Sequence, residues 1–162
     1  MGVHMPVEIK EISVSDDKSK ICEQVLRSLP EWFGNEASIL EYIQGVRDKP
    51  LYAAFDDDTP IGFVSVETHN SYTCEIYVMG ISKAYHKQGI GKKLVEVCVN
   101  FCQSKNMEFL TVKTLDESAE YEYYDRTRKF YLAMGFKPLQ VFPLHWDADN
   151  PCLLMVKLVG AK

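Results

Sequence analysis

The sequence has no long apolar run, no excess of basic residues and no internal repeat. No apolar stretch approaches the roughly 20 residues that cross a bilayer, and the N-terminus has no apolar signal region, so we expect neither a membrane span nor a membrane partner. Asp and Glu number 23 against 18 Lys and Arg, a formal net charge of -5. We expect no nucleic-acid partner, because phosphate-binding proteins usually present a basic surface. A negative surface suits a cationic partner such as an amine, and it also serves solubility alone.

Metal-binding cysteine patterns are missing as well. The five cysteines form no C-x-x-C pair, and no histidine completes a metal set around Cys98 and Cys102. We therefore expect no metal, and we interpret all five as buried thiols in a reducing compartment, the cytoplasm.

Length and composition predict one domain. The chain has 162 residues, 46% of them apolar, enough to bury a core without disulfides. We interpret residues 1–5 as an expression scar that leads into a natural start at Met5. Residues 6–160 are interpreted as a single domain without linkers.

Hydrophobic periodicity predicts alternating strands and helices. Helices are expected at 15–29 (capped near Ser15 and stopped by Pro30), from 35 or 38 to 46, at 89–104 and at 127–134. Strands are expected at 7–12, 51–55, 61–66, 73–81, 109–112, 136–142 and 152–158. About seven strands and four helices in this order predict one α/β domain with a mixed sheet.

A glycine-bearing loop lies between the strand at 73–81 and the next helix. It is made of His86, Lys87, Gln88, Gly89, Ile90, Gly91 and Lys92. Glycines let the backbone approach a ligand closely, and a helix N-terminus directs N–H groups at an anion such as a pyrophosphate. The spacing is neither that of a P-loop nor that of a dinucleotide fingerprint. An ordinary strand–helix turn is the alternative.

With this loop the sequence resembles the GNAT superfamily of acyl-CoA-dependent N-acyltransferases, whose loop reads [Q/R]-x-x-G-x-[G/A]. His86 stands where that family has Gln or Arg. The stretch 77–81 resembles its bulged fourth strand, and 130–136 resembles its F-Y-x-x-x-G-F helix. Tyr124 replaces an asparagine common in the family, which leaves the role of the acidic, tyrosine-rich run 116–125 open. The resemblance implies a single domain with a mostly antiparallel mixed sheet.

The resemblance also implies acetyl-CoA as co-substrate. Its binding residues would be Met79, Gly80 and Ile81 in the strand bulge together with the loop residues 86–92. The activity implied is transfer of the acetyl group to a primary amine by direct attack in a ternary complex. The alternative is a catalytically silent module that senses acyl-CoA. Members of the family often pair through their sheets, so a homodimer is compatible with this reading.

Acetyl transfer needs a base for the amine and an acid for the leaving thiolate. Glu75, a carboxylate in an otherwise apolar strand, resembles the glutamate base of the histone-acetyltransferase branch. Its alternative is a solvent-facing strand residue, in which case His69 or a water is the next candidate base. Tyr131 is the expected acid, with a packed aromatic as its alternative. A backbone N–H of the 79–81 bulge would polarise the carbonyl.

The acceptor amine is expected between the early helices and the last hairpin. Trp32, Phe33 and Glu36 would lie on one side, and Trp146, in the loop 145–149, on the other. Aromatic rings beside carboxylates suit a cation. A small amine, a polyamine, an aminoglycoside-like compound and a peptide amine all remain open.

Overall fold

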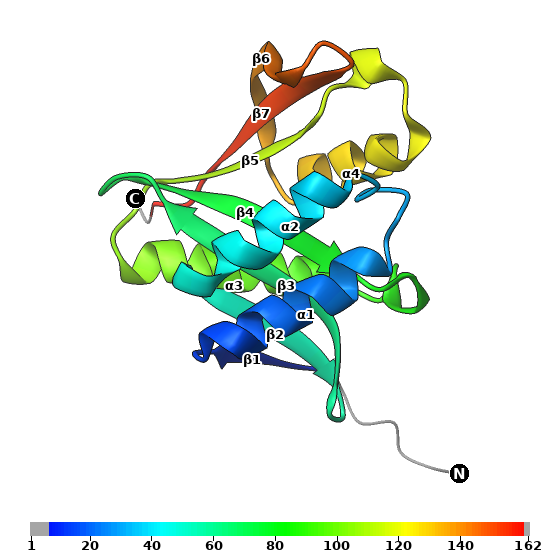
Figure 1. Cartoon of the computed structure of the whole chain (residues 1–162). Coiled ribbons are helices and arrows are strands. Elements are labelled where there is room, and N and C mark those ends of the chain that lie inside the picture. Colours follow the sequence, from blue (N-terminus) through cyan, green and yellow to red (C-terminus); the bar gives the residue numbers. More distant parts are fainter. Residues whose placement is uncertain (1–6, 161–162) are drawn as a thin grey trace. The chain divides into compact units, whose positions relative to one another are not determined.

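The computed structural model describes residues 7–160, so the scar expected at 1–5 lies outside the described residues. Figure 1 shows the arrangement of helices and strands. The strands are β1 Glu8–Ile12, β2 Leu51–Asp56, β3 Thr59–Thr68, β4 Thr73–Ile81, β5 Phe109–Leu115, β6 Lys137–Asp147 and β7 Asn150–Leu158. The α-helices are α1 Ser15–Arg27, α2 Glu36–Gly45, α3 Ile90–Ser104 and α4 Glu122–Ala133.

The seven strands form one mixed sheet in the order β1-β2-β3-β4-β5-β7-β6. β4 pairs with β5 in parallel, whereas β1 with β2, β2 with β3, β5 with β7 and β6 with β7 are antiparallel. This confirms the α/β class and the mixed, mostly antiparallel sheet. Among the described residues, no helix is long and apolar enough to cross a membrane.

Contacts within the chain divide it into two units, and each is described by itself. Unit 1 comprises the chain up to Glu67 together with Tyr77–Cys98, and unit 2 comprises Thr68–Ile76 together with the chain from Val99 on. The boundary therefore passes through the last residue pair of β3, through β4 and through α3.

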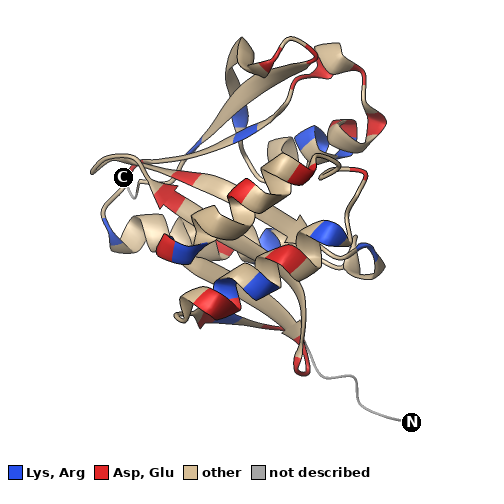
Figure 2. Ribbon diagram, viewed as in Figure 1, with Lys and Arg blue, Asp and Glu red and all other residues tan. Residues whose placement is uncertain are grey.

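In unit 1, α1 and α2 lie on one face of the strands (Figure 1). The buried face of α1 carries apolar residues at helical spacing, which pack on β2, β3 and β4: Ile21, Cys22, Val25 and Leu26. The outer face of α1 carries charges of both signs, whereas the charged residues of α2 are all acidic (Figure 2). α1 ends at Arg27, two residues before the predicted end. Ser15 was expected near its cap, but the cap position is Val14, and the Ser15 hydroxyl donates to the Arg47 carbonyl at 2.8 Å.

The structure decides between the two candidate starts of α2. Asn35 caps α2 by accepting from the Ser38 N–H at 3.1 Å. The buried hydrophobic side chains of α3 are those of Ile90, Leu94, Val95, Cys98 and Cys102, whereas Val97 and Phe101 are half-buried.

In unit 2, α4 follows the 3-10 turn Glu117–Ala119 and begins at Glu122, five residues before its predicted start. Gly135 ends the helical segment with φ +94°. Both final strands are longer than predicted, because β6 and β7 continue to a turn between Asp147 and Asn150. The segment 145–147, predicted as loop, therefore belongs to β6.

Candidate functional site

The glycine loop of unit 1 has the geometry of a backbone cradle. It follows the 3-10 turn Lys83–Tyr85 and leads into α3 at Ile90. Gly89 has φ +79°, a conformation that L side chains rarely adopt, and Lys87 also has a positive φ of 63°. A Cβ built on Gly89 would meet nothing within 4 Å, so space is open above its backbone. The N–H groups at the start of α3 have no acceptor within the helix, since the helical bonds begin with Lys93 to the Gly89 carbonyl.

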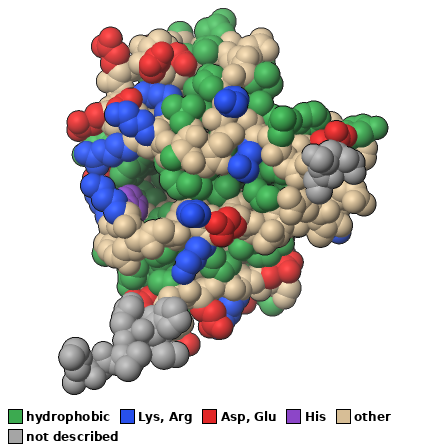
Figure 3. Space-filling view, turned by 180° about the vertical axis from the view of Figure 1, so that it is seen from behind, with side chains coloured by type: hydrophobic (Ala, Val, Ile, Leu, Met, Phe, Trp, Pro, Cys, Tyr) green, Lys and Arg blue, Asp and Glu red, His purple; other side chains and the backbone are tan. Residues whose placement is uncertain are grey.

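The charged residues of the loop and of the first turn of α3 are lysines. Lys87, Lys92 and Lys93 are exposed on the loop and on the first turn of α3. Figure 3 shows that basic side chains gather along one margin of the face it draws. Exposed ammonium groups at a helix N-terminus add to the dipole that attracts anions.

His86 ties the loop to the end of β4. Its Nε2 lies 2.6 Å from the Ile81 carbonyl oxygen, and its ring meets the Trp32 ring edge-on with centroids 5.6 Å apart. Because a carbonyl only accepts, Nε2 carries the proton. His86 therefore holds Ile81, a residue of the predicted bulge, by a hydrogen bond, and its ring packs against Trp32.

A second hydrogen bond holds the same segment to the β2–β3 hairpin. The Tyr85 hydroxyl donates to the Asp56 carboxylate at 2.5 Å. This hydrogen bond, together with burial and the negative charges of Asp56 and Asp57, raises the pKa of Tyr85 above its usual value of 10.0. The segment before the loop is thus anchored from both sides.

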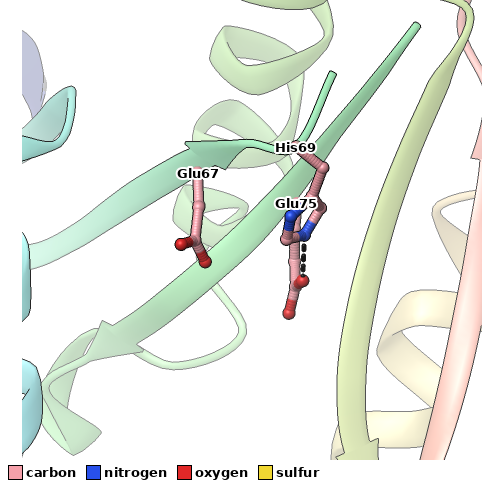
Figure 4. Close-up of side chains that lie close together, drawn as sticks. All are labelled: Glu67, His69 and Glu75. Atoms are coloured by element: carbon pink, nitrogen blue, oxygen red, sulfur yellow. Dashed lines mark hydrogen bonds and ion pairs between the residues drawn. The ribbon is translucent and has the colours of Figure 1, made fainter.

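The Glu75 carboxylate, in unit 2, is buried and hydrogen-bonded to two basic side chains. Its side chain is 8% exposed. His69 Nε2 lies 2.6 Å from Oε1, and Lys113 Nζ donates to Oε1 at 3.0 Å and to Oε2 at 3.1 Å. Figure 4 shows the His69 ring beside the Glu75 carboxylate, with their hydrogen bond dashed. The alternative of a solvent-facing strand residue is therefore wrong.

The parallel pairing of β4 with β5 explains how these groups meet. Glu75 is opposite Thr111, and Lys113 lies two residues farther along β5 on the same face, within diagonal reach. His69 is in the turn before β4, where its backbone N–H donates to the Thr73 carbonyl at 3.0 Å. Lys113 is the residue that sequence reasoning missed. The signal was present, since Lys113 is the one charged residue within the strand 109–115.

Tyr131 is buried on α4 in unit 2, with 6% of its surface exposed. Its ring meets Phe130 and Phe136 edge-on, with centroids 5.3 and 5.4 Å apart. Its carbonyl accepts from the Phe136 N–H at 3.0 Å, which closes the helix end around Gly135. Tyr131 is thus a packed aromatic, and this packing fixes the direction of its ring.

The residues expected around the acceptor amine differ in their exposure to solvent and in their partners. Trp32 and Phe33 are half-buried against the core of unit 1, whereas Trp146 is 44% exposed on β6 of unit 2. The Glu36 carboxylate pairs with both terminal nitrogens of the Arg27 guanidinium at 2.8 and 2.9 Å. The hydrogen bond from Arg27 lowers the pKa of Glu36 below its usual value. Glu36 is therefore already matched by a cation of its own chain.

All five cysteines are buried thiols, as predicted. Burial raises the pKa of Cys22 to about 12, with a smaller contribution from the Glu23 charge. Burial likewise raises the pKa of Cys152 to about 11, although the nearby Lys113 charge opposes the increase. Thiols held protonated in this way are poor nucleophiles.

A family model described as the acetyltransferase (GNAT) domain matches residues 47–138, more than half of the chain. The chain belongs to this GNAT family. The matched segment includes the glycine loop, Glu75 and Tyr131. No curated protein matches the chain.

Solved GNAT structures share the fold at low identity. A protein from Desulfovibrio desulfuricans assigned to the GNAT family has a TM-score of 0.82 at 16% identity, over 96% of this chain and 100% of that one. An aminoglycoside 6'-N-acetyltransferase complexed with coenzyme A has a TM-score of 0.76 at 19% identity, over 96% and 98%. A GNAT acetyltransferase from Elizabethkingia anophelis with acetyl-CoA bound has a TM-score of 0.70 at 16% identity, over 94% and 97%.

Within the GNAT domain, each unit brings together part of the predicted site. In unit 1 the end of β4, His86 and Trp32 are in direct contact. In unit 2 Glu75 contacts His69, the residue considered as its alternative. The substitution of histidine for the family's Gln or Arg has a local reason here, because His86 combines a carbonyl contact with a ring contact to Trp32.

Proposed function

We propose that this GNAT domain transfers an acetyl group from acetyl-CoA to a primary amine, by direct attack of the amine on the thioester in a ternary complex. Membership of the family supports the reaction class. The observation that carries the proposal for this chain is the loop: Gly89 at φ +79° with open space above it, followed by the N-terminus of α3. Such a cradle suits the pyrophosphate of acetyl-CoA.

The binding residues proposed for acetyl-CoA are the loop 86–92 and the strand end Met79, Gly80 and Ile81. Loop N–H groups and the exposed lysines would bind the pyrophosphate. The backbone of the strand end would pair with the pantetheine arm and polarise the thioester carbonyl.

The chemistry has two proton transfers. An alkylammonium has a pKa near roughly 10.4, so at neutral pH the acceptor must lose a proton before it attacks. We assign this side of the reaction to Glu75 and its contacts, and we assign the proton donated to the leaving thiolate to Tyr131. A carboxylate buried against two basic side chains supports the first assignment, and an ordered aromatic ring on α4 supports the second.

The acceptor class proposed is a small-molecule or peptide amine. The negative formal charge of the chain favours a cationic acceptor over an anionic one. An aminoglycoside amine is one member of this class to include in the assay. Five buried thiols fit a reducing compartment such as the cytoplasm.

The test measures release of coenzyme A thiol with a panel of amines, and identifies the acetylated product by mass spectrometry. We expect turnover with at least one cationic amine. Saturable acetyl-CoA binding without turnover on any amine would favour a sensor of acyl-CoA. Neither binding nor turnover would refute both functions.

The loop is tested separately with Gly89→Ala. A Cβ at this position would contact no other atom of the chain. Alanine would, however, have to adopt a positive φ, at a cost of about 1–2 kcal/mol. We expect acetyl-CoA to bind at least tenfold more weakly, measured by calorimetry, in a variant that remains folded. Gly160→Ala is the matched control, because its Cβ would reach the Glu108 atoms at an ordinary 3.4 Å or more. Equal affinities in both variants would remove the loop from the cofactor site.

A further inference from the structure

Three side chains of unit 2 form a chain of hydrogen bonds in which a buried carboxylate joins two partly exposed basic groups. The Lys113 side chain is 29% exposed, the Glu75 side chain 8% and the His69 side chain 39%. Glu75 is in the middle, and both of its oxygens accept hydrogen bonds. The group that reaches solvent most is thus the imidazole and not the carboxylate.

The contacts of Glu75 make it a poor final proton acceptor. A proton placed on either oxygen would displace a hydrogen bond from Lys113 or from His69. It would also leave the Lys113 ammonium beside a neutral, buried carboxyl group, which is costly for a pair of this kind. Glu75 is therefore better suited to hold another group than to take up the proton itself.

The same contact fixes the tautomer of His69. An ionised carboxylate only accepts hydrogen bonds, so Nε2 of His69 must be the donor. In the neutral ring the lone pair is then on Nδ1. A histidine oriented by a buried carboxylate, with the lone pair left on its other nitrogen, is an arrangement that serves as a general base.

We propose that His69 Nδ1 takes the proton from the acceptor amine, that Glu75 positions the imidazole through Nε2–H, and that Lys113 positions Glu75. This inference rests on the proposed acetyl transfer and assigns its proton path.

In the reaction, the ammonium group gives one proton to Nδ1 and becomes a neutral amine. Its nitrogen lone pair forms the C–N bond with the thioester carbonyl carbon, and the C–S bond breaks with its electron pair on sulfur. The nitrogen loses a second proton and the thiolate gains one, giving the amide and the free thiol. The imidazolium then returns its proton to water, so that one proton is released per turnover.

Other ionisable groups near the pair are few among the described residues. Lys113 faces Glu75 from β5. Cys152 approaches both from β7, but its pKa is raised to about 11, so it stays neutral over the assay range. Glu67 lies two residues before His69 in the chain.

The first test is spectroscopic and needs no turnover. We expect long-range ¹H–¹⁵N NMR of the full chain at neutral pH to show His69 as the Nε2–H tautomer, with its signals assigned by their loss in His69→Gln. In Glu75→Gln this tautomer should no longer be fixed. An Nδ1–H tautomer in the wild type would overturn the proposal.

The second test is the pH profile of kcat/KM. With His69→Gln we expect a loss of about 10²–10⁴-fold at neutral pH and unchanged acetyl-CoA affinity. Glu75→Gln should keep more activity than His69→Gln, because the imidazole is still present to accept a proton although its ring is no longer held by the carboxylate. Lys113→Met should lower kcat/KM less than Glu75→Gln does, because the carboxylate still accepts from His69 Nε2. Lys137→Met, exposed on β6, is a matched control for Lys113→Met and should behave as wild type.

The outcomes separate the two proposals. A wild type without turnover on any amine refutes the acetyl transfer. If the wild type has turnover and His69→Gln is equally active, only the role of His69 is refuted. If Glu75→Gln abolishes turnover at every pH while His69→Gln retains it, Glu75 itself takes the proton.

Discussion

In the proposed reaction, the Tyr131 hydroxyl is the group assigned to protonate the leaving thiolate. Tyr131→Phe keeps the ring and its edge contacts with Phe130 and Phe136. We expect turnover to fall by about 10²–10⁴-fold, the contribution typical of general acid catalysis, with acetyl-CoA affinity and thermal stability nearly unchanged. Steady-state kinetics and calorimetry measure both. Tyr52→Phe on β2 is the control, and a Tyr131→Phe variant as fast as wild type would leave Tyr131 a packing residue only.

Cys22 makes stability depend on pH in the alkaline range. Burial raises its pKa from the usual 9.0 to about 12. Below pH 9 the thiol is protonated in the folded and unfolded chains alike. Its full contribution to the free energy of unfolding is then present. Between pH 9 and 12 the unfolded chain ionises first, so the free energy of unfolding falls by about 1 kcal/mol for each pH unit. We expect Cys22→Ala to be less stable at pH 8 but to lose less stability from pH 9 to 10.5, measured by urea unfolding. Parallel curves would contradict this.

At the scale of elements, the connection from β4 to α3 depends on His86. His86→Ala removes the hydrogen bond to Ile81 and the ring contact with Trp32. We expect a loss of about 1 kcal/mol in unfolding free energy and weaker acetyl-CoA binding, because the strand end and the loop are no longer held together. His86→Gln, which restores an amide donor at this position, should recover most of the affinity. Full affinity in His86→Ala would show that the loop holds its shape without this link.

Most elements could be predicted because their signals are local. Strand β4 was predicted with its observed bounds, since Thr73–Ile81 is an apolar run between turn signals. The ends of α4 and β6 could not be predicted in the same way. α4 starts earlier because the turn Glu117–Ala119 brings the chain into helical conformation at Glu122. β6 extends through residues 145–147 because β7 offers partners up to Asn150.

At the scale of the whole molecule, burial of the thiols distinguishes the folded from the unfolded chain. All five cysteines are buried, and a buried thiol reacts slowly with disulfide reagents. We expect no rapid labelling by dithiobisnitrobenzoate in the native protein and labelling of five thiols in urea. Stoichiometric labelling of one or more thiols in the native protein would show that a described thiol is accessible.

The sequence by itself determined the fold class, the glycine loop and the residue types of the site. These depend on periodicity, on glycine's access to positive φ and on residue chemistry, which are properties of short segments. Only the tertiary structure decided that Glu75 is buried and that His69 and Lys113 bind its carboxylate. Lys113 is 38 residues away from Glu75 in the chain, and the register of β5 against β4 sets their approach. The proton path proposed for His69 therefore follows from a strand pairing that no short segment encodes alone.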